Sequence, residues 1–445
     1  MGAGDLDLCY MSAIEALAAF KARTLSPVEL MKAVIARCEA VNPALNLVTH
    51  SYFDRALEQA KAAEARYGKT DGRLRALEGL PFASKDYHAI KGEITTIGSK
   101  IMEHNRPDHT YPVTERLMRA GAILHIRTTT PEFGYAGTSH SPLWGVSRNP
   151  WNPEYTPGGS SGGSGGAVAA GMTTIADGGD GGGSIRIPAS VNGLFGFKPP
   201  YGRNPNDIDG PHAFLVQIGV LTRTVAESAL LQNIVSGPHK ADIASLRTRI
   251  RLPLTYEGIE GWRIAYSPDL GYVQVDPEVQ ENTRKAVQVM FASGLQDFLP
   301  EWRYEMDPRV VDLVERGSRV SAVEFERVSR TRGWMYQKLA PILEDYDVMI
   351  CPTLAVPAVK ADHTNMDPGF TINGKSVEPH MGWLLTYPFN MMNQCPVASV
   401  PTGFAKSGVP TGLQIVGRTY DDARVFRAAA AFETATNWSR HRPSL

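Results

Sequence analysis

Residues 156–190 form the most informative stretch of the chain, and they read TPGGSSGGSGGAVAAGMTTIADGGDGGGSIRIPAS. A run of glycine and serine is often a flexible linker. This run, however, contains an apolar pattern over Ala167–Ala176 and ends in an aspartate and an arginine that flank Gly-Gly-Gly-Ser. Linkers do not usually carry such features. We therefore predict an ordered segment, with a helix over Ala167–Ala170 and a strand over Met172–Ala176.

Short apolar segments alternate with helical segments on both sides of this stretch. The alternation predicts an α/β fold, with a sheet between layers of helices. The predicted strands are Leu80–Ala83, Ala122–Ile126, Trp262–Tyr266 and Val348–Cys351, and the predicted helices are Pro112–Ala120, Pro277–Ala292 and Asp422–Ala435. No repeat and no second linker-like stretch divides the chain. We therefore expect a single domain over residues 1–445.

The first 67 residues are predicted to be helical. Ser12 with Glu15, and Ser26 with Glu29, match the S-x-x-E capping box that begins a helix. Pro43 is expected to stop the second helix, and a third is expected over Tyr52–Tyr67. These helices predict an N-terminal layer packed on the sheet.

Composition excludes several classes of protein. Hydrophobic residues make up 43% of the 445 residues and charged residues 20%, which is globular rather than disordered. The net charge of −1 leaves no basic excess for binding nucleic acid. The four cysteines are scattered, which argues against a disulfide framework or a thiolate zinc site. The acidic start MGAGDLDL and the lack of a long apolar run favour a cytoplasmic protein without membrane contact.

The glycine-rich stretch admits three chemical interpretations. Phosphate binding is disfavoured because neither a P-loop nor a dinucleotide-binding glycine pattern is present. Ser164 lies in a formal G-x-S-x-G, but no strand precedes it, as a nucleophile elbow requires. The third interpretation is a nucleophilic Ser184, since Gly181–Gly183 before it can turn several amides toward an oxyanion. Such a nucleophile needs a base, and a buried neutral lysine can serve.

The same stretch resembles the core motif of the amidase signature family, from Gly158 to Pro188. Four further stretches resemble this family in the expected order: Gly79–Asp86, Thr130–Phe133, Gly193–Pro199 and Gly412–Gly417. The resemblance implies an α/β/α sandwich with a large mixed central sheet. It places the signature core at about 75–235 and a part that completes the sheet and the pocket at about 260–445.

The resemblance also implies a catalytic Ser–Ser–Lys triad and no metal or organic cofactor. Position by position, Ser184 is the nucleophile, Ser160 is the bridging serine next to a cis peptide bond, and Lys85 is the base. Asp180 and Arg186 correspond to the pair that braces the loop. The oxyanion donors are Gly181, Gly182 and Gly183, and the expected substrate-pocket residues are Gly134, Tyr135, Thr138, Trp383, Tyr387 and Phe389. Each pocket aromatic is also an ordinary candidate for the core.

Departures from the family pattern narrow the expected function. The DGGGSIRIP form resembles the branch with aryl acylamidases, nylon-oligomer hydrolases and urethane-cleaving amidases. Ile187 follows Arg186 where the catalytic subunits of tRNA amidotransferases typically carry glutamine. The chain is also short after Ala292: Phe291–Leu295 runs straight into Gln296–Leu299, where the family usually has extra residues near the entrance of the site. This shortness predicts an open mouth or an omitted mobile loop near 292–298.

The leading hypothesis is a stand-alone hydrolase of amide carbon–nitrogen bonds other than peptide bonds. Its expected substrates are neutral aryl or N-substituted amides, with carbamates as further candidates. We expect a monomer or homodimer that binds a small molecule and neither nucleic acid nor membrane. One alternative is the amidase component of a glutamyl/aspartyl-tRNA amidotransferase, and another is a non-catalytic binding protein on the same fold.

Overall fold

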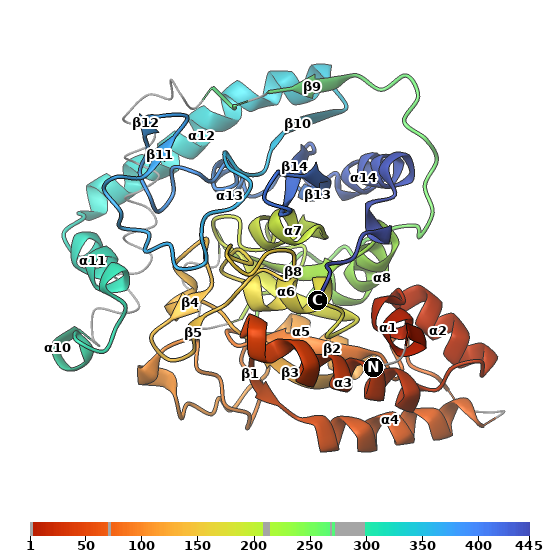
Figure 1. Ribbon diagram of the computed structural model, residues 1–445. Helices are drawn as coiled ribbons and strands as arrows, with labels where there is room; N and C mark the ends of the chain where they lie inside the picture. The colour runs from red at the N-terminus through yellow and green to blue at the C-terminus, as the bar shows by residue number, and fades with distance from the viewer. Residues whose placement is uncertain (1–2, 70–72, 208–213, 268, 272–298) are drawn as a thin grey trace.

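The computed structural model describes residues 3–69, 73–207, 214–267, 269–271 and 299–445, coloured along the chain in Figure 1. The predicted helix Pro277–Ala292 and the predicted loop near 292–298 lie outside these residues. Within them, a ten-stranded sheet has the order β1-β3-β2-β6-β8-β7-β13-β14-β10-β9. In that order the strands are β1 (Val48–Ser51), β3 (Ile123–Thr128), β2 (Pro81–Lys85), β6 (Ile175–Asp180), β8 (Gln217–Thr222), β7 (Phe195–Lys198), β13 (Val397–Phe404), β14 (Pro410–Val416), β10 (Val348–Pro352) and β9 (Ile264–Tyr266).

The sheet is mixed, as expected. Strand β2 pairs in parallel with both β3 and β6, whereas β6, β8, β7, β13 and β14 form antiparallel pairs in turn. Two small hairpins, β4 (His140–Ser141) with β5 (Gly145–Val146) and β11 (Thr371–Ile372) with β12 (Lys375–Ser376), lie outside it. Because β2, β3 and β6 are buried along their whole length, they form the centre that carries the site.

Helices cover both faces of this sheet. Successive side chains of a strand point to opposite faces. On β6, Asp177 accepts a hydrogen bond from Thr114 of α5 (Pro112–Arg119), while the next residue, Gly178, lies against Ser161 at the start of α6 (Gly162–Ala169). Helices α5 and α6 therefore lie on opposite faces, which confirms the layered α/β prediction.

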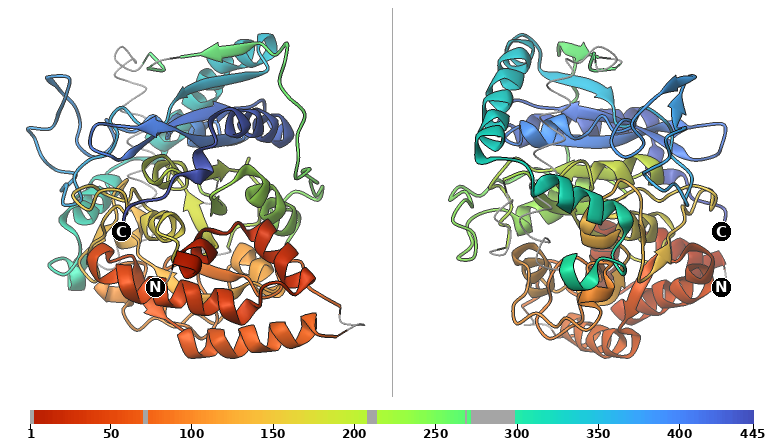
Figure 2. Two further views of the ribbon diagram at one scale, coloured as in Figure 1. Left: turned by 45° about the vertical axis from the view of Figure 1, so that its right-hand side comes forward. Right: turned by 90° about the vertical axis from the view of Figure 1, so that its left-hand side faces the viewer.

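The N-terminal helices lie together along one end of the molecule, in red in Figures 1 and 2. They are α1 (Ala3–Tyr10), α2 (Ala13–Ala22), α3 (Pro27–Leu45) and α4 (Phe53–Tyr67), and both predicted capping boxes are present. The expectation that Pro43 stops the second helix is wrong. Proline removes one amide donor near the end of α3, and the helix continues to Leu45 before Asn46 caps it in a left-handed conformation.

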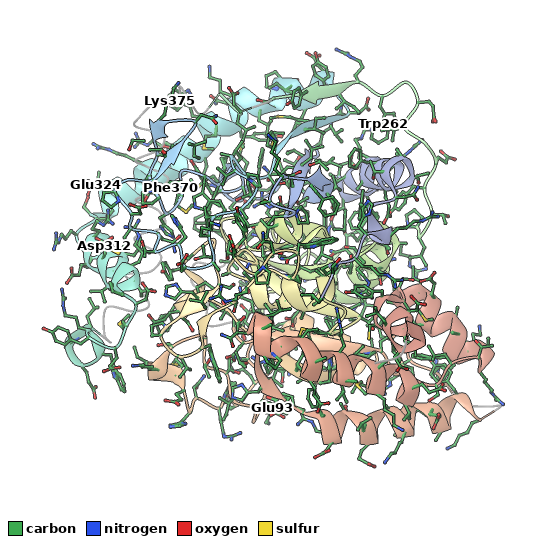
Figure 3. All side chains as sticks on the ribbon, in the orientation of Figure 1. Glu93, Trp262, Asp312, Glu324, Phe370 and Lys375 are labelled. Atoms are coloured by element: carbon green, nitrogen blue, oxygen red, sulfur yellow. The ribbon has the colours of Figure 1, made fainter. Side chains whose placement is uncertain are left out.

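The remaining helices complete the layers. They are α7 (Arg186–Asn192), α8 (Val225–Val235), α10 (Leu299–Trp302), α11 (Pro308–Gly317), α12 (Ala322–Asp345), α13 (Pro388–Met391) and α14 (Asp422–Thr436). Short 3-10 turns lie at Lys100–Met102, Glu132–Gly134 and Trp438–Arg440. Charged side chains labelled in Figure 3, such as Glu93, Asp312 and Lys375, lie at the periphery. Among the helices of the described ranges, none has the length and apolar character needed to cross a membrane.

Candidate active site

The base candidate, Lys85, is the last residue of β2 and is 2% exposed. Its Nζ donates a hydrogen bond of 2.7 Å to Oγ of Ser160, and it lies 5.2 Å from the centre of the Tyr87 ring. The adjacent residue, Asp86, could in principle form an ion pair with Lys85, but its partners are others. Asp86 instead accepts hydrogen bonds from Thr96 and lies 3.5 Å from Nη2 of Arg127.

Burial decides the protonation of Lys85. A buried ammonium loses its hydration, and this effect lowers the pKa of Lys85 from 10.5 to about 7, although the charges of Asp177 and Asp180 oppose it. A large share of Lys85 is therefore neutral near neutral pH. A neutral amine that contacts a hydroxyl at hydrogen-bond distance is able to accept its proton.

Ser160 lies in the turn that leads into α6, and its peptide bond with Gly159 is cis. The turn is packed too closely for a side chain at Gly159, where a Cβ would meet the Thr138 carbonyl oxygen at 2.3 Å. Gly134 lies on the other side, where a Cβ would be 3.4 Å from Ser160 Oγ. Ser160 is 4% exposed, so it retains only a narrow opening.

Ser184 follows the glycines that connect β6 to α7, and it is 8% exposed. Its carbonyl oxygen accepts a hydrogen bond of 3.3 Å from the amide of Ser161. This bond joins the nucleophile loop to the residue after Ser160. The fold thus brings the segments of Lys85, Ser160 and Ser184 together from β2, the α6 turn and the β6–α7 loop.

The glycine amides before Ser184 are not equivalent. The amide of Gly183 donates to Oδ1 of Asp180 at 2.9 Å, so it already has an acceptor. In the described part of the chain, the amides of Gly181 and Gly182 have none. Of the predicted oxyanion donors, these two amides are available to a ligand.

Asp180 and Arg186 form a buried, bidentate ion pair. The Nη2–Oδ1 distance is 2.8 Å and the Nε–Oδ2 distance is 3.0 Å, and neither side chain is exposed. Burial alone would raise the pKa of Asp180, but the charge of Arg186 and the hydrogen bonds from Arg186 and Asn390 outweigh it and lower the pKa to about 2. Arg186 also donates to the Thr386 carbonyl at 2.9 Å and to Gln414 at 2.7 Å. The pair ties the loop to the C-terminal part of the chain.

The predicted pocket residues divide into two groups. Gly134 lies against the catalytic turn, and Thr138 and Tyr135 are buried beside it, where Tyr135 donates to Asp307 at 3.1 Å and Thr138 accepts from Asn365 at 3.1 Å. The aromatic residues of the second group, Trp383, Tyr387 and Phe389, pack into apolar clusters instead.

Phe389 and Trp383 are the most deeply buried aromatic residues of the second group. Phe389 is 1% exposed and packs among Leu339, Cys351 and Val397 in the core between α12 and the sheet. Trp383 is fully buried and packs against Gly137. An uncharged stretch with aromatic residues is compatible with a core or a pocket, and here hydrophobic burial prevails.

Four residues that the sequence did not single out lie beside the site. The ring of Tyr87 shields Lys85, and Thr386 donates a hydrogen bond of 2.6 Å to the Gly182 carbonyl. Val216 and Met381 lie near the positions that side chains at Gly181 and Gly182 would occupy. A weak indication that Tyr87 lies at the site comes from the sequence, since it follows Lys85 by two residues. The others come from segments distant in sequence and carried none.

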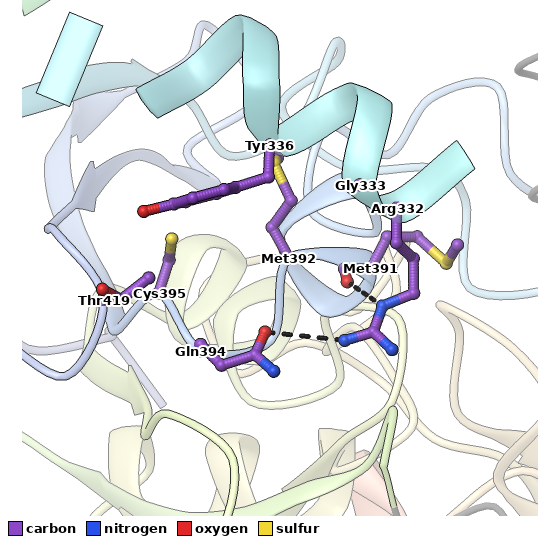
Figure 4. A pocket seen from close by; sticks show the side chains of 8 residues that line it. All are labelled: Arg332, Gly333, Tyr336, Met391, Met392, Gln394, Cys395 and Thr419. Atoms are coloured by element: carbon purple, nitrogen blue, oxygen red, sulfur yellow. Dashed lines mark hydrogen bonds between the residues drawn. The ribbon is translucent and has the colours of Figure 1, made fainter. Parts of the chain in front are cut away.

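Two further observations concern possible ligands. In the described ranges, no group of three or more His, Cys, Asp or Glu side chains is arranged to hold a metal ion. A pocket of about 310 Å³ lies between α12 and the segment after α13 (Figure 4). It is lined by Arg332, Gly333, Tyr336, Met391, Met392, Gln394, Cys395 and Thr419, none of which is a predicted site residue.

The chain is similar to several known proteins. The family model described as Amidase matches residues 29–315 and 292–426. An acylamidase of Rhodococcus erythropolis is 35% identical over 99% of this chain and 98% of its own. A glutamyl-tRNA(Gln) amidotransferase component of Chloroflexus aurantiacus is 31% identical, over 99% of each chain. The crystal structure of a bacterial aryl acylamidase superposes with a TM-score of 0.88 at 27% identity, covering 98% of this chain and 99% of that one.

Proposed function

Because the chain belongs to the amidase family, we propose that it hydrolyses neutral amides by means of a Ser184–Ser160–Lys85 triad and an acyl-enzyme intermediate. Amide hydrolysis is the chemistry of the family, and the sequence is close to an acylamidase. The proposal adds the residues that act and the class of substrate, which we take to be aryl or N-substituted amides. The observation that carries it is the 2.7 Å hydrogen bond from buried Lys85 to Ser160.

The proposed reaction begins with proton transfer. Neutral Lys85 takes a proton from Ser160, and Ser160 takes one from Ser184 as the Ser184 oxygen bonds to the amide carbon. The carbonyl oxygen becomes an oxyanion, which the amides of Gly181 and Gly182 are free to bind.

The tetrahedral intermediate then breaks its carbon–nitrogen bond. The departing amine receives a proton from Ser160, which recovers one from Lys85, so Lys85 is neutral again. Water gives up a proton by the same route and attacks the acyl group on Ser184. The carboxylic acid leaves, and the Ser184 hydroxyl is restored. Each proton taken is returned, so the enzyme needs no other reactant.

The surroundings of the loop favour an uncharged substrate. Among the described residues, Val216, Met381 and Thr386 lie beside the glycine loop and Tyr87 lies beside Lys85 and Gly134, and these side chains are apolar or carry only a hydroxyl. Recognition of a substrate carboxylate usually employs arginine or lysine. A carbamate presents a similar carbonyl and is therefore a second substrate class. Ile187 after Arg186, and the net charge of −1, weigh against an amidotransferase that handles tRNA.

The test is a substrate panel with the purified chain: a neutral anilide, an aliphatic amide, an aryl carbamate, an ester and an amide that carries a carboxylate. We expect kcat/KM to be highest for the anilide and at least about tenfold lower for the anionic amide, a difference of about 1.4 kcal/mol. Preference for the anionic amide would contradict the substrate class. Inactivity on the whole panel, with activity gained only on adding a partner protein, would favour the amidotransferase.

A further inference from the structure

We propose that Asp177 is a positioning residue for Lys85, which holds the end of β2 in place and supplies the negative charge that stabilises the Lys85 ammonium during the reaction. This inference rests on the proposed function and assigns a role to a residue outside the triad. Asp177 lies on β6, next to β2, and is completely buried.

The hydrogen bonds of Asp177 bind the end of β2. Its Oδ1 accepts from the Lys85 amide at 2.8 Å. Its Oδ2 accepts from Ser84 Oγ at 3.0 Å and from Thr114 Oγ1 at 2.7 Å. One carboxylate thus holds the backbone of the base, the preceding residue and helix α5. Movement of Asp177 would move Lys85 relative to Ser160.

Unlike the carboxylates of Asp180 and Asp86, the Asp177 carboxylate has no arginine beside it among the described residues. Asp180 is paired with Arg186, and Asp86 lies beside Arg127. Among the described residues, no arginine or lysine side-chain nitrogen lies within 4.0 Å of the Asp177 carboxylate. The nearest ionisable group is His88, whose Nδ1 is 3.0 Å from Asp177 Oδ1.

His88 contacts only one of the two oxygens of the Asp177 carboxylate. It is completely buried, and its Nε2 has no hydrogen-bond partner in the described part of the chain. Among the described residues, the second carboxylate oxygen of Asp177, Oδ2, contacts only the neutral hydroxyls of Ser84 and Thr114, so the Asp177 charge remains available to Lys85.

The reaction needs such a charge. When Lys85 takes the proton from Ser160, it becomes an ammonium that is almost completely buried from solvent. Asp177 lies on the opposite face of the sheet from Ser160, so its charge acts through the strand without forming a salt bridge that would draw Lys85 away. The other ionisable groups around Lys85 are Tyr87, His88 and the carboxylates of Asp86 and Asp180, each of which has an arginine beside it.

The test compares two variants that change the same cluster. Asp177→Asn keeps the shape and removes the charge, and Thr114→Val removes one neutral hydrogen bond and keeps the charge. We expect the ascending limb of kcat/KM against pH to move to lower pH by about one unit in Asp177→Asn, because Lys85 loses a stabilising charge. We expect kcat to fall about tenfold with KM unchanged, since the charge matters only after proton transfer. The limb of Thr114→Val should stay in place.

If the ascending limb of kcat/KM against pH is at the same position in Asp177→Asn and in the wild type, the inference is wrong and the proposed function still stands. Wild-type inactivity on every amide would instead refute the proposed function. If Asp177→Asn does not fold, His88→Gln provides the test. This variant removes the ring that contacts Asp177 and keeps the Asp177 carboxylate, so its limb should lie at the wild-type position or at higher pH. A shift to lower pH would contradict the inference.

Discussion

At the scale of single residues, the central feature is a lysine that burial makes a base. The sequence motif identifies Lys85, but it does not reveal whether the Lys85 side chain is buried. The pKa of Lys85 is low, about 7, because the side chain is buried beside Tyr87 at the end of β2. The same group has a consequence for stability, because the unfolded chain holds its proton up to about pH 10.4.

Replacing Lys85 by Met tests that consequence. Between pH 7 and about 10.4 the unfolded chain binds more protons than the folded one, so the wild-type free energy of unfolding should rise with pH by at most about 1.4 kcal/mol per unit. Lys85→Met should lack this contribution, be inactive, and be as stable as the wild type or more stable at pH 7. Urea titrations at pH 7 and 9 measure both effects. A variant clearly less stable at pH 7 would show that Lys85 is charged and paired.

The residues that the sequence did not predict explain the limits of prediction at this scale. Asp177 lies 92 positions from Lys85 and meets it only because β2 and β6 are neighbours. Phe389, a predicted pocket residue, belongs to a buried apolar cluster, and composition alone does not distinguish a pocket aromatic from a core aromatic. Chemistry within a continuous motif was predictable, and contacts across strands were not.

At the scale of elements, the glycine loop between β6 and α7 determines where Ser184 lies. Alternating apolar segments predicted β2, β3 and β10 closely. In contrast, the helix predicted at Ala167–Ala170 is α6, which begins at Gly162 within the glycine run. Glycine disfavours a helix by itself. Here close packing requires it, since a Cβ on Gly163 would be 2.4 Å from the Thr129 amide nitrogen.

Two neighbouring glycines offer a matched comparison. Gly183 has a φ of +129°, and a Cβ there would be 2.0 Å from Thr386 Oγ1. A Cβ on Gly182 would meet only Met381 Cε at 3.9 Å. Gly183→Ala should therefore destabilise the fold by about 1–3 kcal/mol or more and lower activity, whereas Gly182→Ala should change stability by less than about 1 kcal/mol. Thermal unfolding of the two variants decides this, and equal melting temperatures would contradict it.

At the scale of the whole molecule, Arg186 connects the signature core to the C-terminal part. Its contacts reach Thr386, Asn390 and Gln414, which lie 200 or more positions away. The sequence predicted a bracing role for the pair with Asp180, and the family resemblance predicted a large mixed sheet, which is confirmed. The partners of Arg186 depend on how distant segments pack, which no local pattern encodes.

Asp180→Asn tests this connection. It leaves Arg186 buried without its carboxylate, so we expect a loss of about 3–5 kcal/mol in the free energy of unfolding at pH 7. The pKa of Asp180 is lowered to about 2, so its contribution is complete above about pH 3.9 and is lost as pH falls toward 2. The difference from wild type should therefore shrink over that range in urea titrations. Glu154→Gln, in an exposed pair with Lys360, is the control and should leave the free energy of unfolding close to the wild-type value.

The most direct measurement of the central claim is where a covalent inhibitor attaches. A serine-directed fluorophosphonate, followed by digestion and mass spectrometry, should modify Ser184 in the wild type. Ser184→Ala should take up no label and lose several orders of magnitude in kcat, because no acyl-enzyme forms. Ser164→Ala and Ser190→Ala, which change buried hydroxyls on neighbouring helices, should keep the label and most activity. Label on Ser164 with Ser184 unmodified would contradict the account.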